Sequence, residues 1–108
     1  MSGNRHIGYI DLGILQMQIL WLLNRKDTHG YELMKNLNEI KKTKITQGTL
    51  YPALQRLEEL NLIKSKKGKR KIIYSLTSKG KKIMSDNCIE FCHTFEGIFK
   101  DYICHHCK

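Results

Sequence analysis

The feature that most constrains the fold is a leucine stripe that contains the only proline of the chain. The leucines are Leu50, Leu54, Leu57 and Leu60. Their spacing of four, three and three residues is typical of one apolar face of a helix. Pro52 interrupts the stripe, and a proline deep inside a helix costs about 3 kcal/mol or more because it has no N–H to donate. The N–H groups of a first turn have no internal acceptor, so we predict that the regular helix starts at Thr49.

Two further helices are predicted ahead of this stretch. Residues 12–24 are apolar on nearly every side, which indicates a helix that is buried on several faces, with Trp21 in the core. Residues 29–40 have the pattern of a helix with one buried face, and we expect Tyr31 and Lys35 on its outside. The predicted inward residues of this second helix are Leu33, Leu37 and Ile40.

Strand periodicity follows the third helix. Asn61 can take the left-handed conformation that ends this helix. The alternating side chains of residues 72–76 indicate a strand, and the pair Lys67-Gly68 is a turn signal ahead of it. We therefore expect a two-stranded hairpin. Its predicted tip consists of Lys66, Lys67, Gly68, Lys69 and Arg70.

A last helix of about 25 residues is predicted after Thr77, whose side chain can cap it. Its apolar seam consists of Met84, Cys88, Phe91, Phe95, Ile98 and Tyr102. The steps of four and three residues between them are those of a heptad repeat, and such a seam needs a partner helix. We therefore expect a homodimer, which would also help a chain of 108 residues to bury enough surface.

Positive charge is concentrated in one part of the chain. The formal net charge is +9, and residues 61–85 hold nine basic side chains and no acidic one. Such segregation indicates a surface that faces a polyanion. The apolar stretch 10–23 is too short to span a bilayer, and no cleavable signal pattern stands out. We therefore expect a cytoplasmic protein that does not contact a membrane.

Three helices followed by a basic hairpin have the order of a winged helix-turn-helix. In that arrangement the first turn of the third helix enters the major groove of DNA, and the hairpin reaches along the backbone. Gln47 and Thr49 could then hydrogen-bond base edges or phosphates, and the Tyr51 hydroxyl could reach a phosphate. Gly48 would let the backbone come close to the DNA.

The sequence resembles the PadR family of transcriptional regulators. Three blocks carry the resemblance: HGYEL at residues 29–33, GTLYPALQRLEELNLI at 48–63 and IYSLTSKG at 73–80. The resemblance implies a winged helix domain and a two-fold dimer that is built by the terminal helix packed with the first helix. It also implies binding to pseudo-palindromic promoter DNA, usually as a repressor that a ligand releases. Asn61 departs from the family's usual glycine, and the tail from Cys88 onward is not part of the usual pattern.

The predicted sites follow from the pattern and the resemblance together. The resemblance implies that His29 and Tyr31 touch the DNA backbone. The full set predicted to contact double-stranded DNA is His29, Tyr31, Thr46, Gln47, Thr49, Tyr51, Arg56, Lys66, Lys67, Lys69, Arg70 and Lys71. The set predicted at the dimer interface is Leu12, Leu15, Met84, Cys88, Phe91, Phe95, Ile98 and Tyr102.

Four cysteines lie in the tail. Cys88 and Cys92 would share one face of a helix, and Cys104 and Cys107 have the spacing of a metal-binding knuckle. A straight helix would separate the two pairs by about 24 Å. An antiparallel dimer with its axis near residues 97–98 would instead bring each pair against the other pair of the partner. Two sites of four thiolates would result, suited to zinc or an iron–sulfur cluster.

Three alternatives for the tail stay open. The tail could fold back within one chain, with His93, His105 or His106 as a substitute ligand. The cysteines could simply pack in the seam as small apolar side chains. Cys104 and Cys107 could form a redox disulfide. A metal ion or a small molecule is accordingly a candidate effector.

The predicted fold class is mainly α with a small β-hairpin. We expect a winged helix DNA-binding domain in residues 1–76 and a C-terminal dimerisation helix with a Cys/His-rich tail in residues 77–108. One competing interpretation is a winged-helix scaffold that binds protein or RNA without operator recognition. Another is a thiol-disulfide oxidoreductase, but the chain lacks the βαβ pattern on which such a low-pKa thiol usually sits. We therefore predict no enzymatic activity.

Overall fold

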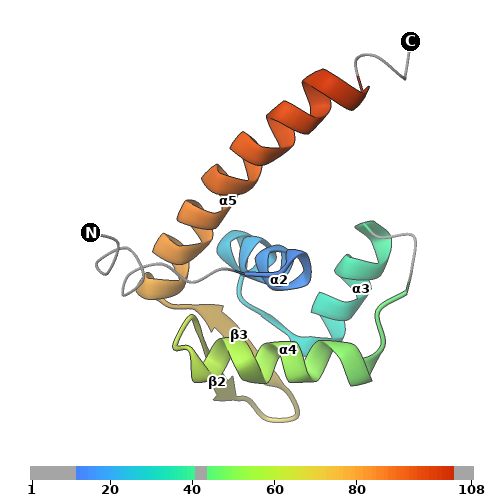
Figure 1. The fold of residues 1–108 in the computed structure, drawn as a ribbon. Helices are drawn as coiled ribbons and strands as arrows, with labels where there is room; N and C mark the ends of the chain where they lie inside the picture. Colours follow the sequence, from blue (N-terminus) through green and yellow to red (C-terminus); the bar gives the residue numbers. More distant parts are fainter. Residues whose placement is uncertain (1–11, 41–43, 104–108) are drawn as a thin grey trace.

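The computed structural model describes residues 12–40 and 44–103, and Figure 1 shows their arrangement. In chain order the elements are α2 (Ile14–Arg25), β1 (Thr28–His29), α3 (Gly30–Ile40), α4 (Gln47–Glu59), β2 (Ile63–Lys67), β3 (Ile72–Leu76), α5 (Ser78–Ile98) and the π-helical turn η1 (Phe99–Ile103). The predicted class, mainly α with a small β-hairpin, is confirmed. No helix in these described ranges is long and apolar enough to cross a membrane.

The core lies where α2 meets α3, α4 and the foot of α5 (Figure 1). Leu50, Leu54 and Leu57 of the α4 stripe are at most 1% exposed, so the stripe is confirmed as core. Two expectations were wrong, because the side chains of Trp21 and Ile40 are 42% and 49% exposed. The reason is a groove that separates the outer side of α2 from the end of α3.

The position of Pro52 also differs from the prediction. α4 begins at Gln47, not at Thr49, so Pro52 is the sixth residue of the helix. The proline removes the hydrogen bond that the exposed Gly48 carbonyl would accept, and water can replace it there. A cost of about 3 kcal/mol is smaller than the gain from the three buried leucines, which is about 1.5–3 kcal/mol each. Packing of the stripe therefore keeps the helix intact around the proline.

The sheet has three antiparallel strands in the order β1-β3-β2, one more than the sequence indicated. The added strand β1 has two residues, and Thr28 pairs with Tyr74. His29 was predicted to be the first residue of a helix, but it lies in β1. A strand of two residues has no periodicity of its own, so only pairing with β3 reveals it.

The hairpin that forms the wing is confirmed, but its tip is shifted. Lys66 and Lys67 belong to β2, where Lys67 pairs with Ile72 across the ladder. The tip therefore consists of residues 68–71. At the base of the wing, Asn61 has a φ of 63°, which confirms the left-handed residue after α4.

α5 is fixed to the winged domain at its foot and extends away from it (Figure 1). The predicted cap is confirmed, since the Gly80 N–H donates to the Thr77 hydroxyl over 2.9 Å. About two turns further, the buried Asn87 amide accepts a hydrogen bond from the Leu12 N–H over 3.0 Å. The same amide donates to the Ile83 carbonyl over 2.9 Å. This amide fixes the segment ahead of α2 to the foot of the long helix.

Candidate nucleic-acid interface

A groove of about 540 Å³ lies between the start of α3, the first half of α4 and the wing. We call it the wing groove, and its lining residues are His29, Gly30, Tyr31, Tyr51, Arg70, Lys71, Ile72 and Tyr74. The tip of the wing supplies its two basic residues, while the rings come from β1, β3 and the two helices. None of the described residues that line it is acidic. The structure thus brings together predicted DNA contacts that are more than 40 residues apart in sequence.

Aromatic side chains form one wall of the wing groove. The rings of His29 and Tyr31 stack with their centroids 6.5 Å apart, and Tyr31 is 65% exposed. The Tyr51 ring packs against Gly30, where an added Cβ would lie 2.7 Å from the Tyr51 hydroxyl oxygen. A side chain at position 30 would therefore have to displace the Tyr51 ring from this wall. Burial raises the pKa of the Tyr74 hydroxyl, helped by Tyr51 and Glu58, so this group stays a neutral hydrogen-bond donor.

The first turn of α4 is open to solvent beside the wing groove. Thr46 is the N-cap residue, but its side chain makes no capping hydrogen bond to the helix. Its hydroxyl instead lies 3.5 Å from that of Thr49, and Gln47 and Gly48 are exposed. The Thr49 N–H donates to the Thr46 carbonyl over 3.1 Å, and the exposed Gln47 and Gly48 lie at the positive end of the helix dipole, which attracts an anion.

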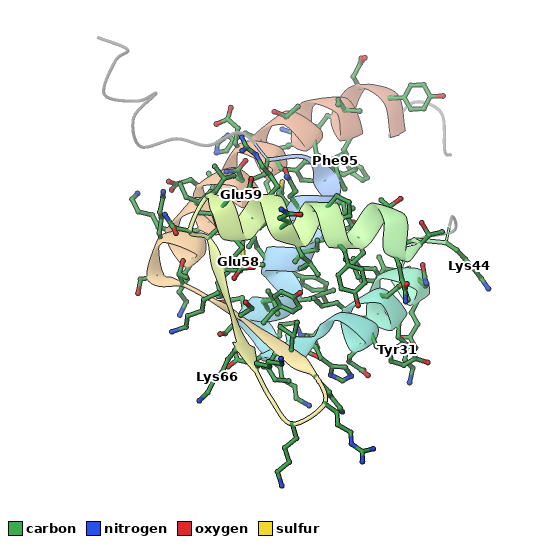
Figure 2. The ribbon with its side chains drawn as sticks, turned by 90° about the horizontal axis from the view of Figure 1, so that it is seen from below. Tyr31, Lys44, Glu58, Glu59, Lys66 and Phe95 are labelled. Carbon is green, nitrogen blue, oxygen red and sulfur yellow. The ribbon has the colours of Figure 1, made fainter. Side chains whose placement is uncertain are left out.

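The basic residues of the predicted set lie in different places. Lys66 lies on the side of the wing, and the tip of the wing projects away from the body of the protein (Figure 2). Arg56, in contrast, lies in the last turn of α4 and pairs with Glu59 over 3.8 Å. It is not brought together with the wing groove. On the same part of α4, Glu58 accepts a hydrogen bond from the Ser65 hydroxyl over 2.7 Å and thereby links the helix to the wing.

One basic residue near this surface was not predicted. The exposed Lys44 lies just ahead of the first residue of α4. In Figure 2 the Tyr31 side chain of α3 lies toward this same end of α4. The sequence feature that could have indicated Lys44 is the short basic run between the second and third helices. The run could not be assigned to the interface until the start of α4 was known.

The predicted dimer residues separate into two groups. Leu12 and Met84 are at most 9% exposed and belong to the core of the protomer itself, and Leu15 packs against this core. Their burial follows from the packing of the α5 foot on α2. Further along α5 the seam is uncovered: the exposed side chains are Phe91 (44%), Phe95 (44%), Ile98 (52%) and Tyr102 (57%). The rings of Phe91 and Phe95 stack with their centroids 5.9 Å apart.

Two of the four cysteines lie in the described ranges. Cys88 is partly buried and Cys92 is exposed, and both are free thiols. Burial, and to a lesser extent Cys92, raises the pKa of the Cys88 thiol. Cys104 and Cys107 lie outside the described residues, so the predicted thiolate sites are not placed. Within residues 12–40 and 44–103, no three His, Cys, Asp or Glu side chains are grouped to hold a metal ion.

Three helices, a short strand and a basic wing that shares a groove with the third helix define a winged helix-turn-helix protein. Residues 19–86 match the transcriptional regulator PadR-like family. This chain belongs to that family, whose members are DNA-binding transcription regulators and not enzymes. The predicted resemblance is thereby confirmed, and the prediction of no enzymatic activity agrees with this family.

Relatives of known sequence and structure agree with this assignment. The chain is 35% identical over 90 residues to the transcriptional regulator YqjI of Escherichia coli K12, a match that covers 80% of this chain and 43% of YqjI. It therefore spans less than half the length of that relative. A PadR family transcription regulator from Clostridium difficile is 30% identical, with a TM-score of 0.75 over 84% of this chain and 99% of the other. A transcriptional regulator from Clostridium thermocellum is 33% identical, with a TM-score of 0.74 over 94% and 98% of the two chains.

Proposed function

We propose that this chain is a homodimeric, sequence-specific DNA-binding regulator that acts in the cytoplasm as a repressor at pseudo-palindromic promoter DNA. The wing groove carries the proposal. It combines hydroxyl, imidazole, guanidinium and ammonium groups with no carboxylate, beside the open first turn of α4. Such a set of donors suits the phosphate oxygens of a nucleic acid backbone.

The two parts of this surface have different roles in the proposal. Arg70, Lys71 and the Tyr31 hydroxyl hold backbone phosphates and fix the register of the protein on the duplex. Gln47 and Thr49 project from the first turn of α4, where side chains of a recognition helix reach base edges in the major groove. Affinity thus comes mainly from the wing groove and sequence preference from α4.

Binding to duplex DNA from the chain's own promoter region tests the proposal. Several phosphate contacts predict that log K falls with log salt concentration with a slope of about −4 or steeper, at about −0.9 per phosphate. A duplex of scrambled sequence should bind more weakly at every salt concentration, and in vitro transcription from the promoter should fall when the protein is added. A shallow slope, or equal affinity for a hairpin RNA, would instead support the scaffold interpretation.

Dimer formation rests on the uncovered face of α5. Its phenylalanines continue into a groove of about 230 Å³ between α2 and α5, whose lining includes Ile14, Met17 and Phe91. A long uncovered apolar face of this kind is best covered by a second copy, with the two α5 helices side by side.

A Phe95→Asp variant should lose the dimer, because the substitution places a carboxylate in the middle of the apolar face. Sedimentation should show a monomer at concentrations where the wild-type chain is dimeric, and operator affinity should fall by about tenfold or more, since one half-site is bound at a time. Ile89→Asp is the matched control. Ile89 is also exposed on α5 (56%) but lies on the opposite side of the helix from Phe91, about 200° away. A Phe95→Asp dimer of unchanged affinity would refute this interface.

The cysteines extend the proposal to a metal or redox response at the same interface. Thiolates that bind a metal ion across the dimer, or that oxidise, would change the spacing between the two recognition helices. Purified protein should then contain zinc or iron, and Cys104→Ser should lose the metal and its effect on operator affinity. Metal-free protein that dimerises and binds DNA normally, in both thiol and oxidised forms, would refute this response.

A further inference from the structure

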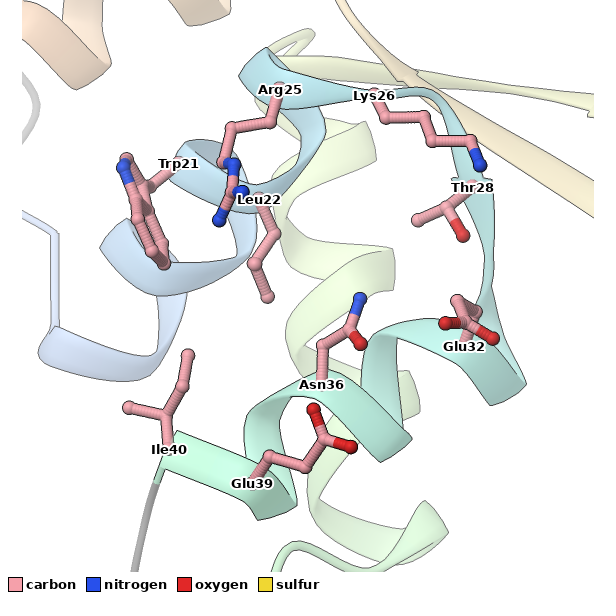
Figure 3. Close-up of a pocket in the computed structure, with 9 residues that line it drawn as sticks. All are labelled: Trp21, Leu22, Arg25, Lys26, Thr28, Glu32, Asn36, Glu39 and Ile40. Atoms are coloured by element: carbon pink, nitrogen blue, oxygen red, sulfur yellow. The ribbon is translucent and has the colours of Figure 1, made fainter.

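A second groove of about 540 Å³ lies on the other side of α3 from the wing groove. We call it the tryptophan groove, and α2 and α3 form its two walls (Figure 3). Trp21 and Ile40 lie at one end of it, and Leu22 lies between the two walls. Exposure of 42% for Trp21 and 49% for Ile40 gives this end an open apolar surface. Its volume is within the range of about 300–1,000 Å³ that is usual for small-molecule sites.

Charges of opposite sign face each other across the tryptophan groove. Arg25 and Lys26 come from the end of α2, and Glu32 and Glu39 come from α3 (Figure 3). No ion pair joins the two sides among the described residues. The Arg25 guanidinium instead lies over the Trp21 ring, 5.3 Å from its centroid. Both walls therefore present charges to the groove that no ion pair within the described part of the chain neutralises.

This arrangement selects one class of ligand. A carboxylate would pair with the Arg25 guanidinium, a protonated amine would pair with Glu39 beside the Asn36 amide, and an apolar body would cover Leu22 and Ile40. A ligand with only one charge would leave the opposite wall unpaired. We infer that the tryptophan groove binds a small zwitterion with an apolar side chain, of the α-amino acid class.

The groove is positioned to act on the dimer. Trp21 also lines the apolar groove between α2 and α5, so a ligand that moves its ring alters the face on which a second copy would pack. This regulatory consequence rests on the proposed function. Binding of the zwitterion does not, because it can be measured without DNA.

The chain contains a single tryptophan, so its fluorescence reports directly on this groove. We expect L-phenylalanine and L-leucine to change the emission of the full-length protein in a saturable way, with calorimetry giving the same affinity. Glycine lacks the apolar body, while phenethylamine and 3-phenylpropionate each lack one charge, and all three should bind at least about tenfold more weakly. No saturable binding of either amino acid, or equal binding of a singly charged analogue, would overturn the inference.

Two variants test the residue assignment. Arg25→Gln and Glu39→Gln should each weaken binding of L-phenylalanine by about tenfold, because each removes one charged partner. Both side chains are exposed, so the fold should persist, and circular dichroism checks this. Glu59→Gln, an exposed carboxylate on α4 outside the groove, is the matched control and should bind as the wild type does. Unchanged affinity in Glu39→Gln or Arg25→Gln would refute the assignment.

Discussion

Replacing Gly80 with alanine should lower the free energy of unfolding by more than about 3 kcal/mol, the largest stability effect that we expect from any single methyl group in this chain. A Cβ at this position would lie 2.0 Å from the Leu62 carbonyl oxygen and 2.9 Å from its carbon. Both atoms belong to the backbone, so no side-chain rotation can relieve the clash. The Leu76 side chain, 2.9 Å away, closes the remaining side.

The close contact at Gly80 also fixes the start of α5 against the base of the wing. The Leu62 carbonyl accepts hydrogen bonds from the Thr77 N–H and hydroxyl, at 3.1 and 3.0 Å. A displaced Leu62 would therefore loosen the base of the wing and the start of α5 together. Urea denaturation followed by circular dichroism measures the effect.

Gly48→Ala is the matched control for this measurement. Gly48 also lies in a first helical turn, but its added Cβ would meet only the Thr46 hydroxyl, at 3.8 Å. We expect stability to be unchanged or raised by up to about 1 kcal/mol, because alanine is the better helix former. A Gly80→Ala protein that is as stable as Gly48→Ala would show that α5 does not pack on Leu62 as described.

Neutralising the tip of the wing should have the largest effect on DNA binding. In the triple variant Lys69→Gln, Arg70→Gln, Lys71→Gln, three cations are lost from the tip while the length of the side chains is largely kept. If each contacts one phosphate, the salt slope becomes shallower by about 2.7, and affinity at 0.1 M salt falls by about 10²- to 10³-fold. Filter binding across a series of salt concentrations measures both quantities.

The control removes the same charge elsewhere. Lys79, Lys81 and Lys82 lie in the first turns of α5, at the far end of β3 from the tip of the wing. The triple glutamine variant at these positions should keep the salt slope of the wild type to within about one unit. Equal losses in the two variants would mean that net charge alone, and not the wing, drives the interaction with DNA.

Several features of the fold could be predicted because each depends on neighbouring residues only. The leucine stripe of α4 repeats within one helix, and Asn61 ends that helix in a left-handed conformation. Thr77 caps α5 by accepting a hydrogen bond from the N–H of Gly80, only three residues later. Local periodicity and backbone preference fix such features wherever the rest of the chain lies.

The candidate site was predictable only in part. Tyr31 and Tyr51 were expected at the interface from the motif, and both lie in the wing groove. Arg56 shares a helix with Tyr51, yet it faces Glu59 in the last turn. Arg56 follows Tyr51 by five residues, which places it about 140° further around the same helix, so the two side chains point to different sides.

The sequence by itself determined the class of this protein: three helices, a basic wing and a long terminal helix, because these follow from local patterns of apolar and charged residues. Only the tertiary structure decided that Thr28 pairs with Tyr74 in a third strand, that Gly80 must have no side chain, and that Trp21 borders a groove. These features arise between segments that are distant in the chain, and packing settles them because two backbones or two helix faces must fit the same space.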